Sequence, residues 1–167
     1  MNTQQDYKTL VEKYPLLFSH PEGSMEPFAL FGFECDIGWY HIIDRACEIM
    51  YRKCRSIKLN IDYYTTHHDT SFLDELKKSL TVEEQWLPKV VQVKEKFGTL
   101  RFYIEGGTAI HSAVADMAES MSEVTCEKCG NNAITFHMGW HKTLCLKHAV
   151  ERYGEEKVTK YLESYAN

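Results

Sequence analysis

The spacing of apolar and polar residues along the chain predicts several helices. A first helix should end before Pro15, because proline cannot continue the backbone hydrogen bonding of a helix. A longer helix is predicted to begin after Asp36, whose side chain suits an N-cap, and to end near Cys54. Further helices are expected at 72–80, 110–121 and 158–165. The apolar face of the helix at 110–121, expected to face the core, would comprise Ile110, Val114, Met117, Ala118 and Met121.

The segment 89–105 alternates apolar and polar residues and predicts a β-hairpin. Gly98-Thr99 suits a two-residue type II′ turn, which would place Phe97 opposite Leu100. The apolar face, expected in the core, would then comprise Val91, Val93, Glu95, Phe97, Leu100, Phe102 and Ile104. The other face would comprise Gln92, Lys94, Lys96, Arg101, Tyr103 and Glu105.

The hairpin contains one charged residue on its apolar face, and the chain contains one further predicted strand. Glu95 is the exception on the apolar face, where it would lie at an open edge, pair with a buried base or line a pocket. The aromatic-rich segment 28–35 predicts a short buried strand. Helices combined with one hairpin in this order predict an α+β fold, not a doubly wound parallel sheet.

Length and composition narrow the class of protein. The 167 residues, 44% of them hydrophobic, fit an α+β domain (1–122) with a smaller C-terminal module (123–167) that ends in a helix and packs on it. The net charge of −5 argues against a polycation that binds nucleic acid along its whole surface. No apolar run approaches the roughly 18–20 residues of a membrane span. The N-terminus lacks a signal-peptide pattern, so we expect a cytosolic protein without membrane contacts.

Two cysteine and histidine pairs predict a metal centre. Cys126-x2-Cys129 is followed, after 15 residues, by Cys145-x2-His148. Three sulfurs and one nitrogen form a closed tetrahedral set for one structural Zn²⁺ ion. A knuckle, two strands around Met138-Gly139 and a helix with the last two ligands are typical of a treble-clef zinc finger. His137 and His141 lie between the pairs, and either could replace His148.

The basic face of the hairpin is a candidate binding site for an anion. An arginine can hold a phosphate with two hydrogen bonds, and Tyr103 offers a ring for stacking. The alternative is that lysines on an exposed strand prevent pairing with other strands. The candidate ligand-binding residues are Lys94, Lys96, Arg101 and Tyr103, together with Glu34, Asp36 and Trp39 around the start of the helix.

Other functions have weaker support in the sequence. A nucleic acid could bind the metal module through Lys128, His137, His141, Lys142 and Lys147. A small metal-dependent hydrolase would use Glu34, Asp36 or the triplet His67-His68-Asp69. These groups would have to converge in one cleft with the face that carries Lys94 and Arg101. A host protein is a further candidate partner, and formation of homo-oligomers stays open.

Several segments resemble a family of uncharacterised tailed-phage and prophage proteins. The matching segments are 14–18, 31–40 (with FECDIGWY at 33–40) followed by Ile43-Asp44, the hairpin VQVKEKFGTLRFY at 91–103, 117–122, Gly139-Trp140 and the C-terminal CxxC…CxxH pairs. The resemblance implies a phage origin and expression in the cytoplasm of a bacterial host, but it implies no activity. The basic and aromatic hairpin face on an otherwise acidic protein, together with the lack of a visible catalytic motif, leads us to expect a non-enzymatic, zinc-stabilised binding protein. It would sequester an anionic, nucleotide-like signal or a host defence factor.

Overall fold

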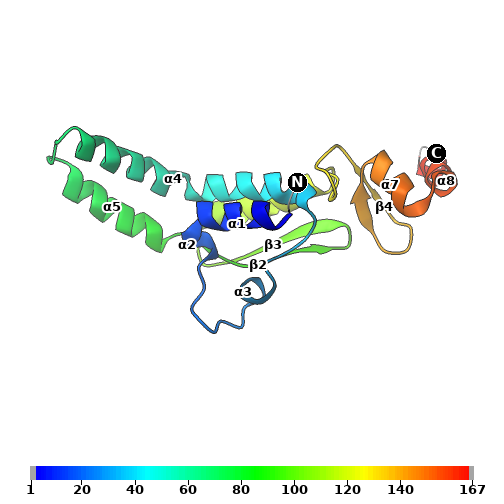
Figure 1. The fold of residues 1–167 in the computed structure, drawn as a ribbon, viewed down its shortest axis with the longest axis horizontal. Helices are drawn as coiled ribbons and strands as arrows, with labels where there is room; N and C mark the ends of the chain where they lie inside the picture. The colour runs from blue at the N-terminus through cyan, green and yellow to red at the C-terminus, as the bar shows by residue number, and fades with distance from the viewer. Residues whose placement is uncertain (1–2, 166–167) are drawn as a thin grey trace.

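The computed structural model describes residues 3–165 of the chain and shows a mixed α/β fold with a small sheet (Figure 1). Its helices are α1 (Thr3–Lys13), α2 (Pro15–Phe18), α3 (Pro27–Phe31), the 3-10 turn η1 (Ile37–Trp39), α4 (Tyr40–Thr66), α5 (Leu73–Gln85), α6 (Ala109–Ser122), α7 (Leu146–Tyr153) and α8 (Glu155–Tyr165). Its strands are β1 (Phe33–Glu34), β2 (Lys89–Lys96), β3 (Thr99–Glu105), β4 (Ile134–Phe136) and β5 (Lys142–Leu144).

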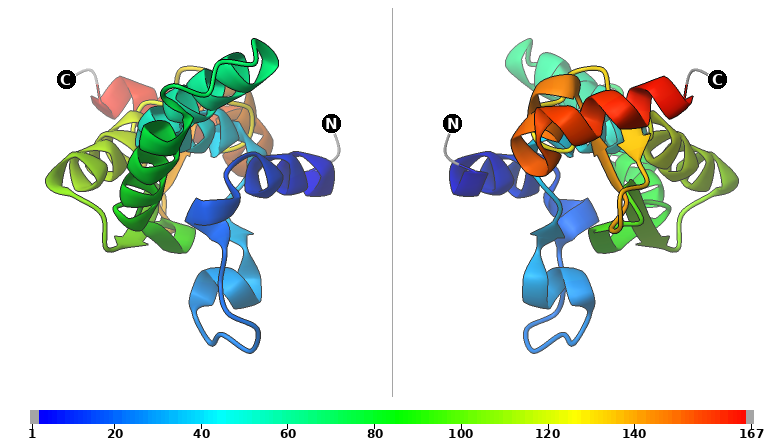
Figure 2. Two further views of the ribbon diagram at one scale, coloured as in Figure 1. Left: turned by 90° about the vertical axis from the view of Figure 1, so that its left-hand side faces the viewer. Right: turned by 90° about the vertical axis from the view of Figure 1, so that its right-hand side faces the viewer.

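The main sheet has the order β1-β2-β3, with β1 parallel and β3 antiparallel to β2. Val93 and Phe102 pair across the hairpin and belong to a hydrophobic cluster with side chains of α1, α2, α4 and α6. Viewed along the molecule, α1 and α6 lie on opposite sides of α4 (Figure 2). One face of the sheet is therefore covered by helices, and the basic face lies outside this cluster.

The hairpin forms as predicted, but its turn is shifted. Lys96 pairs with Thr99, so Phe97 and Gly98 form the turn and both have positive φ. Between Gln92 and Tyr103 the pairing differs from the predicted one by two positions, and because side chains alternate with a period of two, the predicted faces hold in this part of the hairpin. The prediction that Phe97 lies in the core is wrong, since its side chain is 58% exposed. Val91, also predicted in the core, is half-buried beside a register shift in β2.

The physical reason for this turn is contact with β5. A Cβ atom on Gly98 would lie 3.2 Å from the backbone nitrogen of Lys142. Gly98 therefore supplies both the left-handed conformation and the close approach that a side chain would prevent. Two consecutive residues with positive φ also match the twist of the flanking strands.

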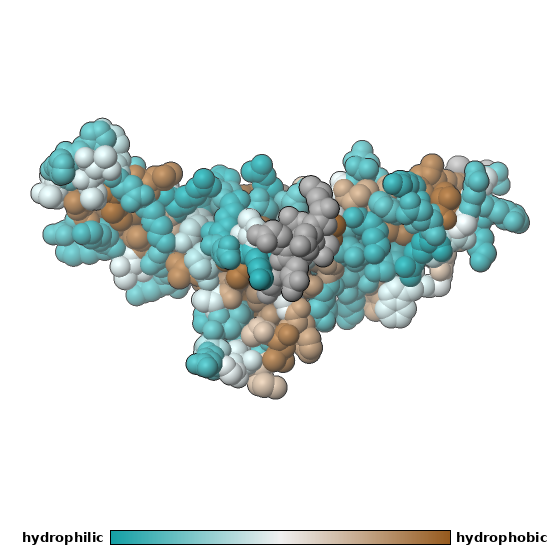
Figure 3. Space-filling view, in the orientation of Figure 1, coloured by the Kyte–Doolittle hydropathy of each residue, from teal (hydrophilic) through white to brown (hydrophobic). Residues whose placement is uncertain are grey.

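The predicted strand at 28–35 is only partly correct. Pro27 begins α3, because proline is favoured in the first turn of a helix, and Gly32 (φ 64°) ends it. Only Phe33–Glu34 remain extended. Exposed apolar side chains gather around α3, below the main body in Figure 3, and they include Met25, Leu30 and Phe31.

Helix α4 is longer than predicted and continues to Thr66. Its second half packs along α5, and together they form an arm, defined here as residues 55–85, that projects from the body (Figure 1). Ion pairs from Lys53 to Glu83 and from Lys58 to Glu84 join the two helices. The arm buries no residue of α5 fully.

The outer edge of β3 is closed by α6 and not by another strand. The hydroxyl of Ser122 accepts a hydrogen bond from the backbone N–H of Leu100 (2.8 Å), and the carboxylate of Glu119 accepts one from Phe102 (2.8 Å). Two edge donors are thus satisfied by side chains, which prevents another strand from pairing there. The predicted apolar face of α6 is only partly correct, because Ile110, Met117 and Met121 are exposed.

The C-terminal part has its own hydrophobic cluster, which includes Phe136, Leu144, Ala149 and Val158. The β4–β5 hairpin, α7 and α8 lie at the opposite end of the molecule from the arm (Figure 1). Among the described residues, no helix combines the length and the apolar character needed to cross a bilayer.

Candidate metal centre and sheet face

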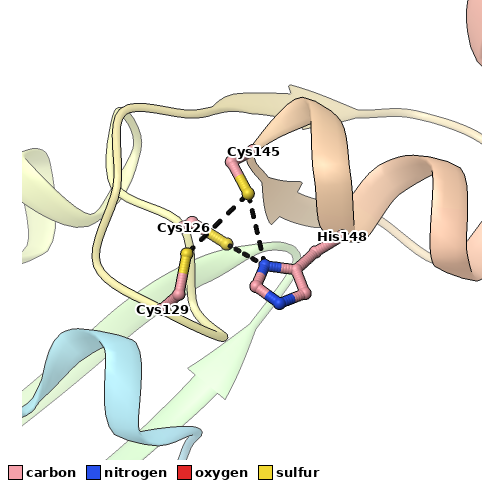
Figure 4. Close-up of side chains that lie close together, drawn as sticks. All are labelled: Cys126, Cys129, Cys145 and His148. Carbon is pink, nitrogen blue, oxygen red and sulfur yellow. Dashed lines mark hydrogen bonds between the residues drawn. The ribbon is translucent and has the colours of Figure 1, made fainter.

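Four side chains converge as the sequence predicted. Cys126 and Cys129 come from the loop after α6, Cys145 precedes α7, and His148 lies in the first turn of α7 (Figure 4). Their ligand atoms all lie within 4.8 Å of one another, so the cluster could hold a metal ion. His137 and His141 lie on the β4–β5 hairpin with their rings 4.4 Å apart and are not part of the cluster.

The distances within the cluster are those of neighbouring ligands. Cys129 Sγ lies 3.8 Å from Cys145 Sγ, and His148 Nδ1 lies 3.4 Å from Cys126 Sγ and 3.2 Å from Cys145 Sγ. Nδ1 is therefore the nitrogen that faces the sulfurs. The other ring nitrogen, Nε2, lies 3.8 Å from the carboxylate of Glu151, which can orient the ring.

The thiols of the cluster differ in acidity. Burial raises the pKa of Cys126 to about 11. Burial acts in the same direction on Cys145, but the backbone N–H of His148 and the neighbouring side chains outweigh it and lower that pKa to about 7. Cys145 is thus the more readily deprotonated of the two, and a thiolate is the form that binds metal. By contrast, burial raises the pKa of Cys35, Cys47 and Cys54 above the ordinary thiol value.

The loop Cys126–Cys129, called the metal knuckle here because it carries two of the four candidate ligands, is packed directly against the start of α4. The backbone N–H of Gly38 donates to the carbonyl of Glu127 (2.8 Å), and the indole N–H of Trp39 donates to the carbonyl of Thr125 (2.8 Å). The Trp39 side chain is fully buried. The segment predicted to line a ligand pocket at Trp39 is therefore the place where the two parts of the chain meet.

A largely buried group of charges extends this contact. Lys142 Nζ lies 2.8 Å from the carboxylates of both Glu95 and Glu127, and the three side chains are 17%, 12% and 4% exposed. The Thr143 hydroxyl donates to the carbonyl of Gly98, at 2.6 Å. We call these five residues the polar junction. Of the alternatives for Glu95, pairing with a buried base is the one that the structure shows.

The open sheet face consists of Glu34, Gln92, Lys94, Lys96, Arg101 and Tyr103, which lie exposed or half-buried on the side of the sheet away from the core. Lys94 Nζ lies 5.8 Å from the centre of the Tyr103 ring, within the range of a cation–π contact. Arg101 is paired with Glu119 (3.3 Å), and Gln92 donates to Glu34 (3.0 Å). Among the described residues, Lys94 and Lys96 have no carboxylate within 4 Å.

Other predicted site residues lie elsewhere. Asp36 is paired with Lys128 (2.8 Å). Both residues line a hollow of about 300 Å³, whose other lining residues include Glu127, Lys142 and His148. Lys142 is paired in the polar junction and Lys147 lies 3.9 Å from the carboxylate of Glu151, so three of the five residues suggested for nucleic-acid binding already have an acidic partner.

The candidate residues of a hydrolase do not meet. His67 directly follows α4, whose end forms the tip of the arm, whereas Glu34 lies in β1 of the main sheet (Figure 1). The groups would have to share one cleft for a common reaction. The structure separates them, so they do not form a single catalytic site.

No protein-family model matches this chain. Comparisons with curated proteins and with solved structures likewise find no match.

Proposed function

We propose that the protein is a non-enzymatic binding protein in which a treble-clef-like module holds one structural Zn²⁺ ion. The four ligands form a closed set without a position for substrate. A tetrahedral site with Zn–S bonds of about 2.3 Å has sulfurs about 3.8 Å apart. The distance between Cys129 and Cys145 agrees with that value. The order of knuckle, β4–β5 hairpin and α7 supports the treble-clef assignment.

The ion would act through the contacts of the knuckle. It would hold the backbone of Cys126–Cys129 against Gly38 and keep Glu127 next to Lys142. A small module with few buried residues gains much of its stability from metal binding. In this proposal 123–167 is the module and 1–122 the domain that it supports.

The binding function is assigned to the open sheet face, for an anionic, nucleotide-like ligand. The observation that carries this proposal is the pair of lysines, Lys94 and Lys96, which project from one strand without carboxylate partners in the described part of the chain. Tyr103 provides an aromatic ring beside them. An ammonium group next to an exposed ring suits a ligand that combines a phosphate with a base.

The sequence resemblance supports a phage origin and a role in the cytoplasm of an infected bacterium. A protein that sequesters a nucleotide-like host signal needs binding groups but no catalytic ones. This role agrees with the charged open sheet face.

The zinc and ligand proposals can be tested separately. A native mass spectrum of protein purified without added metal should show one zinc ion per chain, and its absence from a folded sample would refute the metal assignment. A fluorescent N-methylanthraniloyl-ATP titration should show binding that the Lys94→Ala/Lys96→Ala double variant weakens about tenfold or more. The matched control is Lys77→Ala/Lys78→Ala on exposed positions of α5. Equal affinity of the two double variants would contradict the ligand proposal.

A further inference from the structure

A hollow of about 810 Å³ lies where α4, α5 and the start of α6 meet. Figure 2 (left) views this region from the side of the arm. Met50 and Cys54 are buried in its floor, and Ile49 and Leu87 are partly buried beside them. Small-molecule sites typically have volumes of roughly 300–1,000 Å³ and mostly apolar walls. The hollow has the size and the lining of such a site.

Two large apolar side chains stand at the rim of this hollow. Trp86 follows α5 and is 57% exposed, and Ile110 lies in the first turn of α6 and is 71% exposed. The helical spacing predicts that Ile110 faces the core, but the structure leaves its side chain exposed at this rim. Burying both side chains against an apolar ligand would remove this surface from water.

The polar groups of the hollow leave one positive charge uncompensated. Lys53 and Glu83 neutralise each other across it. The Nδ1 atom of His111 accepts a hydrogen bond from the backbone N–H of Thr108 (3.0 Å), and burial lowers the pKa of His111, so the ring is neutral near pH 7. Arg52 is exposed and has no carboxylate within 4 Å among the described residues. A single free guanidinium suits one carboxylate or sulfonate and is too little for a polyphosphate.

We propose that this hollow binds a small amphipathic monoanion, with Arg52 pairing with the acid group and Trp86 and Ile110 enclosing the apolar body. The hollow shares no lining residue with the open sheet face. This proposal is therefore independent of the nucleotide-like ligand proposed above, and each can fail without the other.

The test uses 8-anilinonaphthalene-1-sulfonate, which has an aromatic body and one sulfonate, with the full chain. We expect saturable binding of one dye per chain. Arg52→Glu should weaken it about tenfold through charge reversal. Ile110→Asp should weaken it similarly by placing a carboxylate at the rim. Displacement by decanoate would show that an aliphatic body is accepted, and displacement by 2-naphthoate but not by decanoate would show a preference for an aromatic one.

Two control variants match these changes. Lys78→Glu makes the same charge reversal on α5, and Val82→Asp replaces another exposed apolar residue, 50% exposed, outside the hollow. Both should leave the dye affinity within about twofold, as should Lys94→Ala/Lys96→Ala. The proposal is wrong if no saturable binding occurs, or if the variants in the hollow bind as tightly as the controls. Near-ultraviolet circular dichroism of every variant separates loss of the site from loss of the fold.

Discussion

A Cβ atom on Gly38 would lie 2.2 Å from the carbonyl oxygen of Cys126 and 2.6 Å from the backbone nitrogen of Cys129. Both contacts are with backbone atoms, which cannot move away as a flexible side chain can. The glycine in the Asp36-Ile37-Gly38-Trp39 segment is thus required by close packing, since its φ is not in the left-handed region.

Gly38→Ala should destabilise the folded protein by about 3 kcal/mol, at the upper end of the usual cost of overpacking. Urea denaturation of the metal-loaded protein measures this free energy of unfolding. Gly139→Ala is the matched control, because it has a positive φ but nothing within 4 Å of its Cβ position. It should cost only about 1–2 kcal/mol through backbone strain. Equal losses in the two variants would argue against the steric explanation.

Replacing His148 by alanine should abolish stoichiometric metal binding, because His148 Nδ1 is the nitrogen that faces the three sulfurs. His137→Ala and His141→Ala should keep one zinc ion per chain. Native mass spectrometry of the three variants, purified in parallel, provides the comparison. Retention of zinc by His148→Ala together with its loss from His141→Ala would reverse the ligand assignment.

Lys142→Met should destabilise the protein by about 3 kcal/mol, because it leaves the buried carboxylate of Glu127 and the half-buried one of Glu95 without their cation. Glu95→Gln added to this variant should restore part of the loss by removing one of the uncompensated charges. Lys147→Met serves as the control, since the Lys147 side chain is 77% exposed, and should change stability by no more than about 0.5 kcal/mol. Thermal and urea unfolding both report the difference. A small effect at Lys142 would mean that the polar junction contributes little to the contact between the two parts.

Ser122→Ala should cost about 1–3 kcal/mol, because the buried backbone N–H of Leu100 loses its acceptor. Ser120→Ala, two residues earlier on α6, removes a hydroxyl that bonds only to its own helix and should be nearly neutral. Hydrogen exchange of the Leu100 amide is a second measurement, and it should become faster in Ser122→Ala alone. Unchanged protection of this amide would show that the edge of β3 is closed by something else.

The sequence was sufficient for features that depend on local spacing. The four metal ligands were identified because two short motifs each bring two ligand atoms together, whatever the rest of the chain does. The faces of the hairpin between Gln92 and Tyr103 were predicted although the turn was not, because alternation with a period of two survives a shift of two residues. The register shift before Gln92, which the alternation does not reveal, buries Val90 and not Val91. The side of β2 that carries Lys94 follows from this alternation alone.

Features that depend on a distant partner were missed. The second half of α4 contains many polar residues, and its half-buried residues Ile57, Ile61 and Tyr64 could not be assigned to a helix face without knowing that α5 packs along it. The ion pairs of Lys142 could not be predicted either, because Glu127 is 15 residues and Glu95 is 47 residues away from it in the sequence. Similarly, Glu119 and Ser122 look like ordinary polar positions of a helix until β3 lies next to them.

Because α4 is one continuous helix, a change in its direction at the start displaces its far end. One end of this helix begins beside the metal knuckle at Trp39, and its 27 residues run without a break to the tip of the arm. At about 1.5 Å per residue this helix is about 40 Å long. A rotation of about 5° at the knuckle would move the tip by about 3–4 Å, estimated from that length. The position of the arm tip in space therefore depends on how the buried first half of α4 is held in the body, and the backbone contacts around Gly38 fix its starting end.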